Sequence, residues 1–390
     1  MALDKVSPAM MSPQSVGETA PSEPYVGQRW YRASTAVTYQ YTNDGTSSFW
    51  LDVTSGGIGT SASRGIDFVG DIDPHKATNG SGLAVGSVYY NREGNRHFVC
   101  TDNTSGANVW SGRYSGIGGI VTDYVSGGTY YRVHTFLNNG TFVMDGTTSI
   151  DYLVVGGGAG GGTNEGGGGG AGGFRTGAGL SISSGTYEIT VGNGGLGGGA
   201  PSLPGGQGGI SIFSSITATG GGAGTGQTGG TSGKDGGSGG GATRSGSAGS
   251  GIYNGAHTLG LVTHQGRNGG IGNGSYRAAA GGGGASAVGA NASSAAVAGA
   301  GGAGATNAYR TGSNVTYAGG GGGGSWGNGN AGGAGGAGGG ATGNSTGVAV
   351  PTPATVNTGG GGGGGGSTAV GATVAGGDGA SGIVVIRYAL

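Results

Sequence analysis

The chain has little charge, a single cysteine and no long apolar run. Lys, Arg, Asp and Glu make up 8% of its 390 residues, against about 25% in an average soluble domain. The net charge of −1 provides no basic surface for nucleic acid and no polybasic patch for a membrane. Because no apolar stretch is long enough to span a bilayer, we also expect no membrane insertion.

Cys100 is the one cysteine, which excludes an internal disulfide and a zinc site built from cysteines. Stability must therefore come from packing and backbone hydrogen bonds. The first eight residues lack the apolar core of a secretory signal, so we expect a protein made in the cytoplasm of its host cell.

Glycine is what the chain has in excess. It accounts for 110 of the 390 residues, and only 21 of these precede Gly156. The glycine-rich region runs from Gly156 to Gly377, directly after an apolar strand pattern at residues 150–155 and before another at 382–388. Each glycine costs about 0.5–1 kcal/mol relative to alanine in a helix or strand, so neither element suits this region.

An extended threefold helix, polyglycine II, can use this composition. It has about 3 residues per turn, a rise of about 3.1 Å per residue and no internal hydrogen bonds. Without Cβ atoms, several such helices can approach closely and bond to one another through their backbones. Disorder, the other common state of glycine-rich sequence, is disfavoured because few Pro, Glu or Lys residues accompany the glycines. We predict a bundle of packed polyglycine II helices joined by loops.

Residues 1–118 divide into an arm and two related modules. Residues 1–24 contain four prolines and predict an extended attachment arm, with a frayed terminus as the alternative. Val26–Tyr31 matches Val85–Tyr90 at an offset of 59, so residues 25–60 and 61–118 read as two copies of one module. Strand patterns at 38–41 and 97–100, each followed by turn residues, predict β-hairpins.

Residues 119–390 are expected to form a glycine-rich domain framed by β-strands. Strand patterns at 130–136, 141–144 and 149–155, separated by Asn-Asn-Gly and Asp-Gly turns, predict a β-meander that leads into the glycine region. The overall class is therefore all-β, with short hairpin modules followed by a β-framed bundle of polyglycine II helices.

Four blocks of residues 130–390 resemble the glycine-rich domain of bacteriophage tail-fibre and adhesin proteins. The first block is His134-Thr135-Phe136 with Gly140-Thr141-Phe142 and Tyr152–Gly158. The other three are Gly185–Gly192, Ser211–Gly222 and Gly382–Tyr388. The hairpin modules, with their Val-Gly-x-x-aromatic-Tyr pattern, are similar to modules strung along phage tail fibres. The resemblance implies a virion protein that attaches to a host receptor without enzymatic activity, through loops of the glycine-rich domain. It further implies that residues 1–24 join other tail proteins, and that the fibre is a homo-oligomer, in the usual arrangement a trimer.

Receptor contact is expected where side chains interrupt the glycines. Aromatic rings bind sugar faces, and arginine pairs with carboxylate or phosphate, so a cell-surface glycan or an outer-membrane protein loop would suit as partner. We expect these interruptions to turn at accessible ends of the bundle; the alternative is that Tyr253 or Trp326 only covers its end. The candidate contact residues are Tyr253, His257, His264, Arg267, Tyr276, Arg277, Tyr309, Arg310, Tyr317 and Trp326.

No catalytic, cofactor-binding or metal site is predicted. G-x-G-x-x-G matches here arise by chance, since no helix pattern follows them. His257 and His264 share one loop and could hold an ion, and two of the four acids beyond Gly156 could form a hydrolase pair, but neither pattern is specific. The alternatives to a receptor-binding protein are a structural or decoration protein of the virion, a bacterial surface adhesin and an ice-binding polyglycine protein.

Overall fold

A computed structural model of the protein describes two compact units, Met1–Arg113 and Tyr114–Leu390. The described residues form β-strands and extended segments with no α-helix, which confirms the all-β class. In the first unit the description covers residues 14–16, 19–22, 29–32, 37–43, 48–52, 68–70, 74, 83–85, 87–91, 96–105 and 108–113. In the second it covers 116–199, 201–227, 232–252, 265–273, 277–293, 297–327, 330–344, 351–367 and 373–389.

The first unit contains two four-stranded sheets with the same topology. In each, the first strand pairs in parallel with the second, and the remaining pairs are antiparallel. One sheet has β1 (Gln14–Val16), β2 (Arg29–Arg32), β3 (Val37–Asn43) and β4 (Ser48–Asp52); the other has β5 (Phe68–Gly70), β6 (Val88–Asn91), β7 (Arg96–Asp102) and β8 (Val109–Arg113). The two predicted hairpin strands are confirmed as β3 and β7. Strand β1 lies in residues 1–24, the segment that we predicted to be an extended attachment arm.

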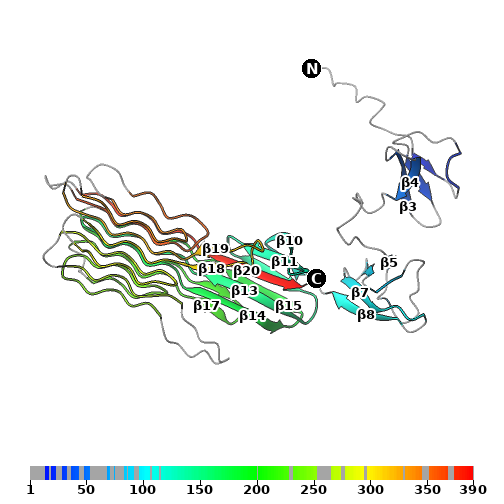
Figure 1. The fold of residues 1–390 in the computed structure, drawn as a ribbon, viewed down its shortest axis with the longest axis horizontal. Helices are drawn as coiled ribbons and strands as arrows, with labels where there is room; N and C mark the ends of the chain where they lie inside the picture. The colour runs from blue at the N-terminus through cyan, green and yellow to red at the C-terminus, as the bar shows by residue number, and fades with distance from the viewer. Residues whose placement is uncertain are drawn as a thin grey trace, which may run out of the picture. The chain divides into compact units, whose positions relative to one another are not determined.

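The second unit contains two five-stranded sheets packed face to face (Figure 1). The first sheet has the order β10-β11-β20-β13-β14, with β10 (Ile120–Ser126), β11 (Thr129–Phe136), β20 (Ile383–Ala389), β13 (Thr148–Val155) and β14 (Phe174–Ile182). The second has the order β17-β16-β15-β12-β9, with β17 (Ile216–Ala218), β16 (Ser211–Phe213), β15 (Gly185–Thr190), β12 (Gly140–Met144) and β9 (Gly116–Ile117).

The main core lies between these two sheets. Phe142 and Phe213 of the second sheet pack with Tyr152, Val384 and Ile386 of the first, and all five are nearly or fully buried. Alternate residues of β13 and β20 point to the opposite face of the first sheet, where they meet a second cluster. Both faces of this sheet are thus covered, which explains why residues 152–155 of β13 and every residue of β20 except Arg387 are apolar.

The predicted β-meander is wrong in its pairing, although its three strands exist. Strand β12 pairs with β15 and β9 in the second sheet, whereas β11 and β13 both pair with β20 in the first. The turns at Asn138–Gly140 and Asp145–Gly146 therefore cross from one sheet to the other. Alternating apolar residues reveal which face of a strand is buried, but they do not reveal which strand lies beside it.

A short hairpin covers the outer face of the first sheet. It consists of β18 (Ala305–Asn307) and β19 (Val315–Tyr317), paired antiparallel. The Tyr317 side chain is 1% exposed and packs with Val133, Leu153 and Val385. This hairpin interrupts the glycine-rich region and ties it to the sheet.

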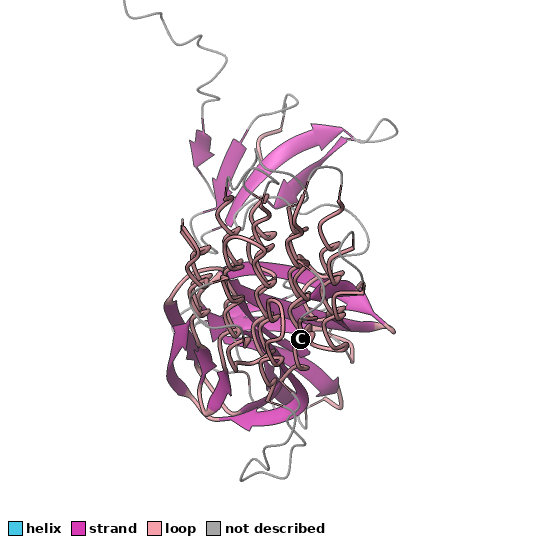
Figure 2. Cartoon of the chain, turned by 90° about the vertical axis from the view of Figure 1, so that its left-hand side faces the viewer, coloured by secondary structure: helices cyan, strands magenta, loops and turns pink. Residues whose placement is uncertain are grey.

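The glycine-rich segments extend away from the strands and lie side by side (Figure 1), and Figure 2 views them end-on as coiled traces. Their hydrogen bonds have a period of three. The N–H groups of residues 156, 159 and 162 donate to the carbonyls of residues 173, 170 and 167, in one neighbouring segment. Those of residues 157 and 160 donate to 209 and 206 in a second segment, and those of residues 158 and 161 donate to 380 and 377 in a third. Each segment therefore bonds to three neighbours in turn, which is the pattern of a threefold helix without internal hydrogen bonds.

Glycine is required in these segments because backbone carbonyls occupy the place of a side chain. A Cβ added to Gly157 would lie 2.0 Å from the carbonyl oxygen of Asn193, and one added to Gly158 would lie 1.9 Å from that of Gly360. Helices this close can satisfy their backbone groups with one another. The prediction of packed threefold helices thus agrees with the hydrogen-bond pattern and with the close approach of the backbones.

Candidate binding surface at the far end of the bundle

The bundle of glycine-rich segments has two ends: the sheet end, where the segments join the β-strands, and the far end, which lies away from the strands. Residues 156–162 leave β13, residues 163–165 turn, and residues 166–173 return to β14, so this turn lies at the far end. The N–H of Gly324 donates to the carbonyl of Gly166 at 2.8 Å, which places the next residues, Ser325 and Trp326, at the far end as well. Side chains here are held on a scaffold of mutually bonded backbones.

Glu165 is the centre of a charged cluster at the far end. Its side chain is 1% exposed, and its two carboxylate oxygens meet two arginines: Oε1 lies 3.0 Å from Arg277 Nε, and Oε2 lies 3.3 Å from Arg244 Nε. Both arginines remain partly exposed. A buried carboxylate of this kind needs such partners, because an unpaired charge in the interior is strongly destabilising. Glu165 thereby fixes two cationic groups at the surface.

The turn that carries Glu165 is itself tied to its neighbours. Asn164 and Glu165 have φ angles of 57° and 56°, a left-handed conformation that asparagine tolerates but that is uncommon for glutamate. The Asn164 Nδ2 group donates to Ser202 Oγ at 2.9 Å and to Gln227 Oε1 at 3.0 Å. Separate loops of the far end are thus joined through one buried turn.

Trp326 adds an aromatic ring to this cluster. The Arg277 guanidinium lies over the indole at 4.4 Å from the ring centre, a cation–π contact. Gly327 N–H donates to the Ser367 carbonyl at 2.9 Å, and Ser367 N–H donates to the Ser325 carbonyl at 3.0 Å. We call Glu165, Arg244, Arg277 and Trp326 the far-end cluster.

The structure places the candidate contact residues at different ends of the bundle. Arg277 and Trp326 lie together at the far end, whereas Tyr309 and Arg310 lie beside the sheet in the connection from β18 to β19. Arg267 is half-buried within the bundle, where its N–H donates to Gly284 and its carbonyl accepts from Gly239. Tyr253, His257, His264 and Tyr276 lie outside the described residues.

One expectation about these residues is wrong. Tyr317 packs in the core and is 1% exposed, so its side chain is not presented on the surface. The segment 253–264 is flanked by Ile252 and Gln265, and Gln265 accepts from Phe174 N–H at 2.8 Å at the start of β14. Both flanks therefore lie at the sheet end. The chain reverses direction at both ends of the bundle. An interruption in the glycines therefore does not show by itself which end it occupies.

Glu165 and Arg244 were not among the contact residues predicted from the sequence. Residues 163–165 interrupt the glycines between Gly162 and Gly166, so the same criterion that selected Trp326 could have selected this turn. The turn was not selected as a contact site because it contains no aromatic residue. Of the other acids beyond Gly156, Asp235 accepts from Ser250 N–H at 2.6 Å and Asp378 from Gly197 N–H at 2.7 Å.

Among the described residues, no group of three His, Cys, Asp or Glu side chains is placed to hold a metal ion. In the same part of the chain, no helix has the length and hydropathy to cross a membrane.

The two five-stranded sheets and the bundle of glycine-rich segments together define a β-framed glycine-rich domain. Residues 135–389 match the model of a protein family described as a glycine-rich domain. Because this match covers more than half of the chain, the chain belongs to the glycine-rich domain family. No curated protein matches the chain.

Proposed function

We propose that the protein is a bacteriophage tail-fibre protein that attaches to a host cell-surface receptor, without enzymatic activity, through the far end of its glycine-rich domain. The receptor is a surface glycan or an outer-membrane protein. Residues 1–24 join the other tail proteins, and the fibre is a homo-oligomer, with a trimer favoured. The protein is made in the host cytoplasm and carried on the virion. The phage assignment is supported by the residue blocks described above, which resemble tail-fibre and adhesin sequences.

The observation that carries the attachment proposal is the fixed position of Arg277 and Trp326. Their loops emerge from backbone-bonded helices, and the buried Glu165 holds the arginine in place at 3.0 Å. Side chains ordered in advance lose less entropy on docking. Tryptophan and arginine are also the residue types that dominate binding energy at protein interfaces.

Binding to cells tests this proposal. Fluorescently labelled full-length chain is incubated with bacterial strains that display capsule, lipopolysaccharide or neither, and bound label is measured by flow cytometry. We expect saturable binding to a subset of strains. Trp326→Ala should weaken it by at least 2 kcal/mol, or about 30-fold, as for an interface hot spot.

Val125→Thr is the control, since this side chain is 54% exposed on β10, among the strands. It should bind like the unmodified chain. If Trp326→Ala and Val125→Thr bind equally well, the far end is not the attachment surface.

The second candidate is a structural or decoration protein of the virion, in which the same loops contact other virion subunits. It is favoured by the network around Asn164 and Glu165, because such a rigid surface also suits permanent assembly. Particles that carry Arg277→Ala with Trp326→Ala distinguish the two functions. Particles that assemble but fail to adsorb support attachment, whereas particles that fail to assemble support the structural role.

A further inference from the structure

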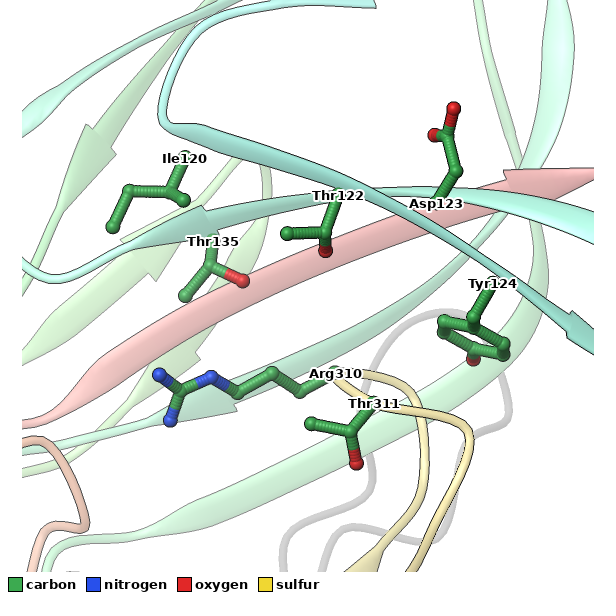
Figure 3. A pocket seen from close by; sticks show the side chains of 7 residues that line it. All are labelled: Ile120, Thr122, Asp123, Tyr124, Thr135, Arg310 and Thr311. Atoms are coloured by element: carbon green, nitrogen blue, oxygen red, sulfur yellow. The ribbon is translucent and has the colours of Figure 1, made fainter. Parts of the chain in front are cut away.

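A pocket of about 320 Å³ lies beside the first sheet, at the opposite end of the bundle from the far-end cluster. Its floor is the edge of the sheet, and its other side is the connection from β18 to β19 (Figure 3). The lining residues are Ile120, Thr122, Asp123 and Tyr124 of β10, Thr135 of β11, and Arg310 and Thr311 of the connection.

Arg310 gives this pocket its charge. Its side chain extends along the pocket below Thr135 and toward Ile120 (Figure 3). The nearby Arg132 and Arg387 each pair with an aspartate. Among the carboxylates that the structure describes, none forms an ion pair with Arg310.

Asp123, the acidic residue of the pocket, is already paired. Arg132 Nε lies 3.0 Å from its Oδ1, and Arg132 Nη2 lies 2.9 Å from its Oδ2. This forked contact compensates the aspartate charge. Of the charges that line the pocket, the positive charge of Arg310 is therefore the one that can pair with an incoming anion.

The connection that carries Arg310 is held in place before any ligand arrives. Tyr309 N–H donates to Asn307 Oδ1 at 2.8 Å, and the Tyr124 hydroxyl donates to the Tyr309 carbonyl at 3.1 Å. The Arg387 guanidinium stacks on the Tyr309 ring at 4.0 Å. A binding group fixed in this way loses little freedom when it engages a ligand.

We propose that this pocket binds a single carboxylate-bearing sugar, a hexuronic acid. Arg310 pairs with the carboxylate in the forked geometry that suits a guanidinium. The hydroxyls of Thr122 and Thr135 exchange hydrogen bonds with the sugar hydroxyls, whereas the Thr311 hydroxyl is already bonded to Ser313. Ile120 and the Tyr124 ring contact the apolar face of the sugar.

The size of the pocket limits the ligand to one ring. Ligand pockets in proteins span about 300–1,000 Å³, and this one is at the lower end of that range. The proposal does not depend on the function proposed above, because the pocket is built by the sheet and its hairpin rather than by the far-end cluster.

A titration of the full-length chain with D-glucuronic acid, followed through the methyl resonances of Ile120 and Thr135, tests the proposal. The dissociation constant expected for one monosaccharide is about 1 mM. D-glucose, which lacks the carboxylate, should bind the unmodified chain at least tenfold more weakly. D-glucuronic acid should bind the Arg310→Gln variant at least tenfold more weakly than it binds the unmodified chain. Val121→Thr, on the opposite face of β10, should leave binding unchanged.

Several results would overturn the proposal. These are equal binding of D-glucose and the acid, unchanged binding to Arg310→Gln, or no resonance shift with the acid at about 50 mM. Inorganic phosphate provides the last comparison, because a site that reads only negative charge would bind it as tightly as the sugar acid. That outcome also contradicts a sugar site.

Discussion

The α-carbon of Gly361 faces the carbonyl oxygen of Gly169 so closely that an added Cβ would lie 2.0 Å from that oxygen. Gly361 N–H donates to Gly319, and the carbonyl of Gly361 accepts from Ala341 N–H, both at 2.9 Å. One residue thus bonds to two neighbouring segments while its α-carbon touches a third. Glycine is therefore a requirement of the architecture at this position.

We expect Gly361→Ala to destabilise the bundle by about 3 kcal/mol, because overpacking a rigid site costs roughly 1–3 kcal/mol and the contact is with backbone rather than with a movable side chain. Gly199→Ala is the matched control, since an added Cβ there meets nothing within 4 Å, and a change within about 0.5 kcal/mol is expected. Hydrogen exchange of peptides from residues 156–389, measured by mass spectrometry, reports both effects. Similar exchange in the two variants would contradict the packing described here.

Much of this bundle could be predicted from composition, since glycine without charge leaves few options other than backbone-to-backbone packing. The strands at 130–136 and 382–388 could also be predicted, because β-branched residues alternate or run together there. The pairing of these strands could not be predicted. Strand β20 lies between β11 and β13 although more than 200 residues separate it from either, and no local pattern encodes such a partner.

Glu165 provides the second prediction. Replacing it by glutamine removes the charge that faces Arg244 and Arg277, and we expect a loss of about 2 kcal/mol, within the range for hydrogen bonds to charged groups. Glu188→Gln, at an exposed position of β15, should have little effect. Thermal unfolding measures the stability, and the indole N–H resonance of Trp326 should broaden or shift only in the first variant. An unchanged indole resonance in Glu165→Gln would show that the carboxylate does not position the ring.

The far-end cluster shows why the binding surface was harder to predict than the fold. Trp326 and Arg277 were identified as candidates because they interrupt the glycines. Tyr317 and Arg310 met the same criterion, yet they lie at the sheet end, one in the core and one in a pocket. The sequence marks where the chain leaves the threefold helix, but the direction in which each helix runs decides at which end the interruption lies.

Arg387 connects three strands and supports the third prediction. It pairs with Asp151 at 2.8 Å, donates to the Tyr124 hydroxyl at 2.6 Å and stacks on Tyr131 at 4.2 Å. The side chains of Arg387 and Asp151 are 13% and 20% exposed, so Arg387→Gln leaves a largely buried carboxylate unpaired and should cost about 3 kcal/mol.

The ion pair between Arg132 and Asp123 is the comparison, because these side chains are 27% and 45% exposed. Arg132→Gln should cost about 0–1 kcal/mol, as is usual for surface pairs. Urea unfolding of both variants gives the two values. If Arg132→Gln proves the more damaging, burial does not control the contribution of these pairs.

The fourth prediction concerns pH and rests on His134. Its side chain is fully buried, and burial lowers its pKa from the ordinary value of 6.5, with the Gly118 carbonyl partly opposing that shift. In the neutral form that this lowered pKa favours, Nδ1–H donates to the Gly118 carbonyl at 2.7 Å, and Nε2 accepts from the Tyr388 hydroxyl at 3.3 Å. The Tyr388 hydroxyl in turn accepts from Gly116 N–H at 2.7 Å.

Because the pKa of His134 is lower in the folded than in the unfolded state, the unfolded chain takes up this proton first as the pH falls. The stabilisation is complete above the unfolded pKa of about 6.5 and is lost progressively below it, by up to about 1.4 kcal/mol per pH unit for one proton. Urea unfolding at pH 7.5, 6.5 and 5.5 should show this loss. His134→Gln should be less stable at pH 7.5 but should lose less stability on acidification. Parallel pH dependence in the two proteins would mean that another group is responsible, since the chain contains four further histidines.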